Sequence, residues 1–178
     1  MKRNQKLVTI SIYVSLALVL DYIKAFIPFL NMPAGGSINI ALIPIVICSF
    51  HLGVVCGIGA GLLWWFISSI LGLNPYFISL SQYIVDYIIP SGVIGICSMF
   101  YKKKNIFEIE SGIILMMIIR TLSLLVSGAI FWPEGVASGS LTAWTASLAY
   151  NLPYSIATLI MLLIIIPIII RSLKKYFN

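Results

Sequence analysis

Long apolar runs separated by short polar breaks dominate this chain of 178 residues. The pattern marks six apolar segments, at about 7–28, 38–50, 53–73, 77–100, 113–132 and 141–170. A helix that crosses the hydrocarbon core of a bilayer needs about 20 apolar residues, and most of these runs reach that length. The pattern therefore predicts an all-α integral membrane protein with six transmembrane helices in a single domain, 1–178.

The second segment is the exception in length. Its 13 or so residues would give a helix of ~20 Å, against a hydrocarbon core of ~30 Å. It follows a loop at 28–37 (PFLNMPAGGS) whose prolines and glycines exclude helix. Irregular backbone at membrane depth is tolerated where it lines a cavity. We therefore expect loop 28–37 to dip inward and fold over the outer mouth of a pocket.

Glycines recur at four-residue spacing in the third segment, at Gly53, Gly57 and Gly61. Small residues at this spacing leave a bare strip of backbone on one helix face. We expect another helix to pack closely against that strip.

Composition and charge agree with a membrane protein. Apolar residues make up 61% of the chain and charged residues 9%, with a mean hydropathy of +1.09, whereas soluble domains average about 25% charged residues. The net charge of +6 is explained by topology rather than by nucleic-acid binding. With six spans, one side of the membrane receives nearly all bases: Lys2, Arg3, Lys6, Lys102, Lys103, Lys104, Arg171, Lys174 and Lys175. The positive-inside rule then places both termini in the cytoplasm of a cell-membrane protein.

Signatures of catalysis are missing from the sequence. It has no Walker A loop, HExxH or GxSxG motif and no paired carboxylates. The cysteines lie within apolar runs without CxxC spacing, so they predict neither a metal site nor a disulfide. We expect no enzyme activity and no cofactor. A membrane enzyme and a channel remain as alternatives of another class, although a channel would need polar residues along the whole membrane path.

Asp86 is an acidic residue deep within an apolar segment. Asp86 lies ~13 Å below the outer end of the fourth segment, with Tyr87 beside it and Gln82 one turn above. A carboxylate in hydrocarbon usually marks a functional site. Further polar and indole groups lie in the outer halves of other segments: Trp132, Tyr150, Asn151 and, midway along the third, Trp64 and Trp65. A carboxylate among amides and indoles predicts a pocket for a flat, cationic, nitrogen-rich molecule.

Structural roles compete with these interpretations. Asp86 lies at a depth where it can pair with Arg120, which would make it structural. Trp132 can belong to an interfacial aromatic belt, and Asn151 can hydrogen-bond between helices. Trp64 and Trp65 point to different faces, so at least one is expected to meet lipid. Asp21 and Lys24 are expected to form a local i,i+3 pair.

The sequence also resembles a known family. The stretch Tyr76–Gln82 followed by Asp86 and Tyr87, the run Gly128–Trp132 (GAIFW) and the run Ser147–Asn151 (SLAYN) are similar to the thiamine-specific substrate-binding subunits of energy-coupling factor transporters. The resemblance covers essentially the whole chain. It implies a small membrane subunit that binds a vitamin from outside and works with a transmembrane coupling protein and two ATPase subunits.

The resemblance also implies roles for single residues. Asp86 stands where the family has a glutamate that grips the aminopyrimidine, Trp132 where a tryptophan stacks on the ligand, and Asn151 where an amide contacts it. Further expected ligand residues are Tyr87, Trp65, Gln82, Gly128 and Tyr150. Ser11 and Ser15 keep the four-residue spacing of small residues through which the first span meets the coupling protein.

Four features of the family differ, and one of them is a loop tryptophan that has no counterpart among Pro33 to Ser37. A histidine is replaced by Leu124, a second carboxylate by Asn39, which remains an expected ligand residue, and a tyrosine by Ala146. Each lost hydrogen bond costs about 1 kcal/mol. The positions that match the family make thiamine the expected ligand. The positions that differ leave a thiamine precursor or another heterocyclic vitamin as the alternative.

Overall fold

The computed structural model describes residues 2–24, 26–33, 36–73, 76–102, 105–133 and 135–172. Its described elements are helical, and they follow in this order: α1 (Arg3–Lys24), η1 (Pro28–Leu30), α2 (Leu42–Leu52), α3 (Val54–Ile70), α4 (Leu80–Tyr83), η2 (Ile84–Ile88), α5 (Ile89–Gly92), η3 (Val93–Ser98), α6 (Ile106–Phe131) and α7 (Leu141–Ser172). Because α4, η2, α5 and η3 form one continuous stretch, the six predicted segments appear as six helical segments.

Four of these segments are long and apolar enough to cross a membrane: α1, the stretch Leu80–Ser98, α6 and α7. The other two, α2 and α3, are shorter apolar helices. The prediction of a short second segment is confirmed, since α2 has 11 residues. The fifth segment begins earlier than predicted, at Ile106, where the side chain of Asn105 caps the helix by accepting a 2.9 Å hydrogen bond from the N–H of Glu108.

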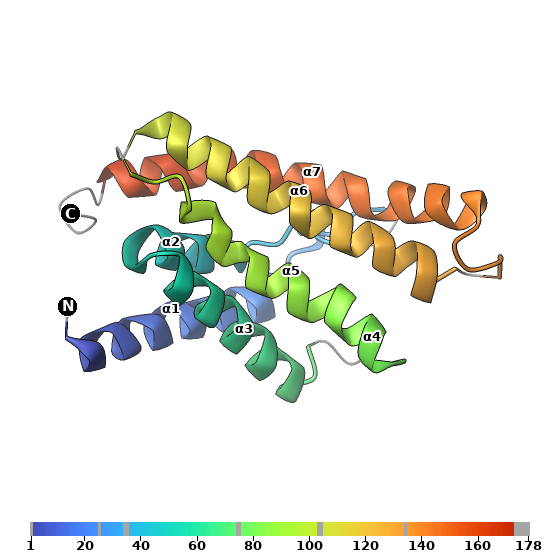
Figure 1. Ribbon diagram of the computed structural model, residues 1–178, viewed down its shortest axis with the longest axis horizontal. Coiled ribbons are helices and arrows are strands. Elements are labelled where there is room, and N and C mark those ends of the chain that lie inside the picture. Colours follow the sequence, from blue (N-terminus) through green and yellow to red (C-terminus); the bar gives the residue numbers. More distant parts are fainter. Residues whose placement is uncertain are drawn as a thin grey trace.

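The helices lie roughly along one direction, with α6 and α7 side by side (Figure 1). The start of α1, the start of α6 and the end of α7 lie at the same end of the bundle (Figure 1). Arg3 and Arg171, at those ends of α1 and α7, belong to the predicted basic side. Lys103, Lys104, Lys174 and Lys175 lie outside the described residues.

Glycines set how closely α3 packs against the stretch 89–98. A methyl group on Gly61 would meet the carbonyl oxygen of Ser91 at 2.1 Å, and one on Gly57 would meet the Cα of Gly95 at 2.8 Å. Gly53 differs from the prediction, because it is the turn residue between α2 and α3 and adopts φ +91° with open space around it. The close contact therefore involves two of the three predicted glycines.

The segment before α2 is irregular and enters the helix bundle. The N–H of Ile38 donates to the carbonyl of Leu30 at 2.8 Å, which closes the loop on itself. Beyond it, the N–H of Asn39 donates to the hydroxyl of Thr158 on α7 at 3.1 Å. Gly36, with φ +76°, lies so close to the ring of Tyr154 that a Cβ there would be 2.3 Å from it. Ala34 and Gly35 of this loop lie outside the described residues, and the lid role stays a prediction.

Candidate functional site

A cavity of ≈ 440 Å³ opens between α1, α3, the stretch 84–92, α6 and α7. Eight of the nine predicted ligand residues line it: Asn39, Trp65, Asp86, Tyr87, Gly128, Trp132, Tyr150 and Asn151. The chain therefore brings together residues that are up to 112 positions apart, from Asn39 to Asn151. Their roles toward a ligand remain predictions.

Asp86 is held by two neutral donors. Its Oδ2 accepts a 2.9 Å hydrogen bond from the side-chain amide of Gln82 and a 3.2 Å bond from the indole N–H of Trp132. The alternative pairing with Arg120 is absent, because Arg120 donates instead to the carbonyl of Pro90. Among the described residues the ion pair is Lys24 with Asp21, at 2.7 Å. Asp86 thus faces the cavity as a carboxylate without a protein cation beside it.

Gln82 is placed differently from the expectation. It is fully buried and does not line the cavity. Its amide oxygen accepts from the N–H of Ile78 at 3.3 Å, while its amide nitrogen donates to Asp86. Both ends of the side chain are therefore used within the protein. Gln82 orients the carboxylate from behind, one helical turn away.

A local change of helix type aims Asp86 into the cavity. Residues Ile84–Ile88 form a π-turn, in which the N–H of Ile89 donates to the carbonyl of Ile84. In this register the next donor would be residue 90, but proline has no N–H. The hydroxyl of Ser123 supplies the missing bond to the carbonyl of Val85 at 2.5 Å. Single π-turns inside helices are frequent at functional sites, and here Pro90 provides its physical cause.

Ser123→Ala is expected to lower stability by about 1–3 kcal/mol, because it leaves a half-buried carbonyl without its donor. The π-turn would then lose the bond that holds it against α6, so ligand affinity should fall as well. Thermal unfolding of the purified protein in detergent measures the first effect and ligand titration the second. Ser111→Ala, near the start of the same helix, is the matched control and should change neither. An unchanged unfolding temperature for Ser123→Ala would contradict this role.

Aromatic rings form much of the cavity wall. Tyr76 contacts Trp132 edge to face, with ring centroids 5.8 Å apart, and both rings line the cavity. Trp65 packs against Tyr83 with a centroid separation of 5.4 Å. Both Trp64 and Trp65 line the cavity. Trp64 is 5% exposed and Trp65 is partly exposed, so the expectation that at least one of them meets lipid stays a prediction for Trp65.

Asn151 is anchored within α7. Its amide nitrogen donates to the carbonyl and to the hydroxyl of Ser147, at 3.0 and 3.2 Å, and its oxygen accepts from the hydroxyl of Tyr154. Gly128 of α6 allows this cluster to approach, since a Cβ there would lie 2.3 Å from the Ser147 hydroxyl. The hydrogen bonds of Asn151 thus lie within α7 rather than between helices, which differs from the structural alternative, and its side chain lines the cavity.

Several residues that line the cavity were not among the predicted site residues. Asp21 and Lys24 form the predicted pair, yet both also line the cavity. Tyr154 lies one turn beyond Asn151, whereas the family tyrosine falls at Ala146, one turn before it. The three-residue spacing between Asn151 and Tyr154 was the signal that could have identified Tyr154, because residues three and four apart share a helix face. Arg120 was considered only as a partner of Asp86.

With this geometry in place, comparison with known proteins identifies the family. Residues 7–178 match the sequence profile of the thiamine transporter protein family. The chain is 30% identical to the thiamine transporter ThiT of Bacillus subtilis (strain 168), over 98% of this chain and 94% of that one. The chain belongs to the thiamine transporter protein family. It is therefore a substrate-binding, multi-pass membrane protein and not an enzyme, which confirms the predicted function class.

The fold agrees with that of a solved family member. A structure of ThiT from Listeria monocytogenes superposes with a TM-score of 0.83 at 26% identity, and the match covers 99% of each chain. The family identified from the runs around Asp86, Trp132 and Asn151 is thus confirmed.

Proposed function

We propose that this protein binds thiamine in the cavity at Asp86 as the substrate-binding subunit of an energy-coupling factor importer. The observation that carries the proposal is the Asp86 carboxylate, which is held by Gln82 and Trp132 but lacks a cationic partner. Thiamine brings an aminopyrimidine that can donate to a carboxylate and a thiazolium ring that carries positive charge. A carboxylate already oriented by neutral donors loses little on binding such a ligand.

The surrounding rings suit the same ligand. Trp132 and Tyr76 lie at right angles to one another beside Asp86, and Tyr87 and Tyr150 line the same cavity. The faces of aromatic rings attract cations, most strongly for tryptophan. The cavity volume of ≈ 440 Å³ falls in the range of typical small-molecule sites, ~300–1,000 Å³.

The positions that differ from the family also border the cavity. Leu124 and Ala146 line it with apolar groups, whereas the family has hydrogen-bonding side chains there. The hydroxyl of Tyr154 reaches Asn151 from the other direction along α7 and supplies a polar group in the same region. We infer that thiamine binds through Asp86 and the rings, with fewer polar contacts than the family pattern implies.

The expected topology and partners belong to this proposal. Both termini would lie in the cytoplasm, supported by the basic ends of α1 and α7, and the cavity would open to the outside. Ser11 and Ser15 are exposed on α1, on a face that the described chain leaves uncovered, beside exposed apolar residues such as Ile12 and Val19. That face would meet the coupling protein.

Calorimetry of the purified protein with thiamine tests the proposal. We expect saturable binding at micromolar concentrations or below, accompanied by quenching of tryptophan fluorescence, because Trp64, Trp65 and Trp132 line the cavity. Pyrimidine and thiazole fragments, titrated separately, show which half of the vitamin carries the affinity. Binding of another heterocyclic vitamin in place of thiamine would refute the substrate, and heat without quenching would refute the site.

A further inference from the structure

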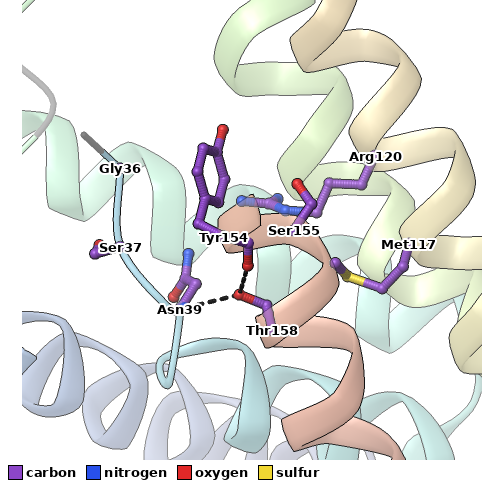
Figure 2. A pocket seen from close by; sticks show the side chains of 8 residues that line it. All are labelled: Gly36, Ser37, Asn39, Met117, Arg120, Tyr154, Ser155 and Thr158. Carbon is purple, nitrogen blue, oxygen red and sulfur yellow. Dashed lines mark hydrogen bonds between the residues drawn. The ribbon is translucent and has the colours of Figure 1, made fainter. Parts of the chain in front are cut away.

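Arg120 carries a positive charge to the cavity and forms no ion pair with a described acidic residue, although Asp21 and Asp86 line the same cavity. It lies in the middle of α6, half-buried, and its described hydrogen bond is to the carbonyl of Pro90. A guanidinium has several N–H donors, so most of them remain available. Beside it is a second cavity, of ≈ 190 Å³, which shares the lining residues Asn39, Arg120 and Tyr154 with the first. Figure 2 shows Arg120 directed toward this space from α6.

The lining of this second cavity mixes polar side chains with Met117 and contains no carboxylate. Ser155 is 5% exposed, and its hydroxyl makes no hydrogen bond to another described residue, although it borders the cavity. The hydroxyl of Thr158 is already used, because it donates to the carbonyl of Tyr154 at 2.7 Å and accepts from the N–H of Asn39 (Figure 2). The side-chain amide nitrogen of Asn39 likewise has no described acceptor. Available donors thus come from three separate elements.

The balance of charges around the large cavity indicates what kind of ligand these donors would bind. The ionised residues that line the large cavity are Asp21, Lys24, Asp86 and Arg120, two acids and two bases, whose charges cancel. A cationic vitamin would add one positive charge. An uncompensated charge is costly where burial limits its access to water, and Arg120 is half-buried. A single negative charge next to Arg120 would restore neutrality.

We propose that Arg120, Ser155 and Asn39 form a site for a small inorganic anion, such as chloride or phosphate, which binds together with the vitamin. The proposal rests on the proposed function, since the vitamin supplies the charge that the anion balances. The volume of ≈ 190 Å³ accommodates either ion, given that a water molecule occupies ~30 Å³ in the liquid. Anion and vitamin each raise the affinity of the protein for the other by the same factor, as linkage requires.

Thiamine titrations by tryptophan fluorescence test the site. The purified protein is kept at constant ionic strength while the bulky anion gluconate is replaced by chloride or by phosphate. We expect thiamine affinity to rise by about tenfold, within the usual range of coupling between sites. Arg120→Gln should abolish this dependence and Ser155→Ala should reduce it, whereas Ser111→Ala, at the far end of α6, should retain it.

A thiamine affinity that is the same in all three anions would overturn the proposal, as would a full anion dependence in Arg120→Gln. If Arg120→Gln does not fold, the wild type and Ser155→Ala decide the question alone. Thiamine monophosphate distinguishes a free anion from a phosphate group carried by the ligand as the source of the negative charge. Anion-independent binding of thiamine, with much tighter and Arg120-dependent binding of the ester, would assign the site to a phosphate carried by the ligand and overturn the free anion.

Failure of the proposed function gives a different result, namely no thiamine binding in any buffer. Crystals of the thiamine complex soaked in bromide test the anion site directly. An anomalous scattering peak beside Arg120 and Ser155 would support it, and a cavity without a peak there would refute it.

Discussion

Asp86→Asn is expected to weaken thiamine binding by at least about 100-fold, or roughly 3 kcal/mol. The substitution removes the negative charge that meets the cationic vitamin. It keeps an oxygen that can still accept from Gln82 or Trp132, which now hold the carboxylate at 2.9 and 3.2 Å. Calorimetry measures the loss of affinity. Thermal unfolding of the unliganded protein should stay nearly unchanged.

The two measurements distinguish a ligand-binding carboxylate from a structural one. If Asp86 stabilised Arg120, its neutralisation would leave a buried cation without a partner and destabilise the fold. Arg120 instead donates to the carbonyl of Pro90. Glu110→Gln, the same acid-to-amide change near the start of α6 and away from the cavity, is the control. Equal losses of stability and binding in Asp86→Asn would contradict the proposed role.

Gly61→Ala is expected to destabilise the protein by about 2–3 kcal/mol and to lower its unfolding temperature by roughly 5–10 °C. The new methyl group would lie 2.1 Å from the carbonyl oxygen of Ser91. Backbone cannot rotate away as a side chain can, so α3 and the stretch 89–92 must separate. Because Pro90 and Ser91 follow the π-turn of Asp86, thiamine affinity should fall as well.

Gly59→Ala provides a matched control on the same helix. A methyl group there meets nothing within 4 Å, and alanine favours helix over glycine by up to about 1 kcal/mol. The two variants are therefore expected to shift the unfolding temperature in opposite directions. A similar shift for both would show that helix propensity, rather than the contact between α3 and Ser91, sets the effect.

The sequence was most informative about features whose placement in a bilayer costs free energy. Apolar segments, a short second helix and the isolated Asp86 each follow from local composition, since every buried charge or irregular segment needs a compensating reason. Family membership followed from short runs around Asp86, Trp132 and Asn151. The structure and the comparisons bear out the helical architecture and the family.

Other features depended on distances between segments and could not be derived from the sequence. The partner of Asp86 is an example. Asp86 and Arg120 lie at similar depths in their apolar segments, which favoured a pair. Pairing also depends, however, on how α6 and the stretch 80–98 are rotated relative to each other. Gln82 faces Asp86 rather than the cavity, and its amide finds a donor in the N–H of Ile78, just before the helix, and an acceptor in Asp86. Trp64 and Trp65, which are adjacent in the sequence, both line the cavity, and helix periodicity alone did not predict this.

The sequence by itself thus determined that the chain is a membrane protein with six apolar segments and marked Asp86 as a candidate for function, because these follow from the cost of placing polar groups in hydrocarbon. Only the tertiary structure decided which side chains share the cavity and which charges remain unpaired, because contacts across helices depend on helix rotation and on the π-turn at Pro90. Arg120, which the sequence suggested as a structural partner of Asp86, therefore lies where both cavities border it.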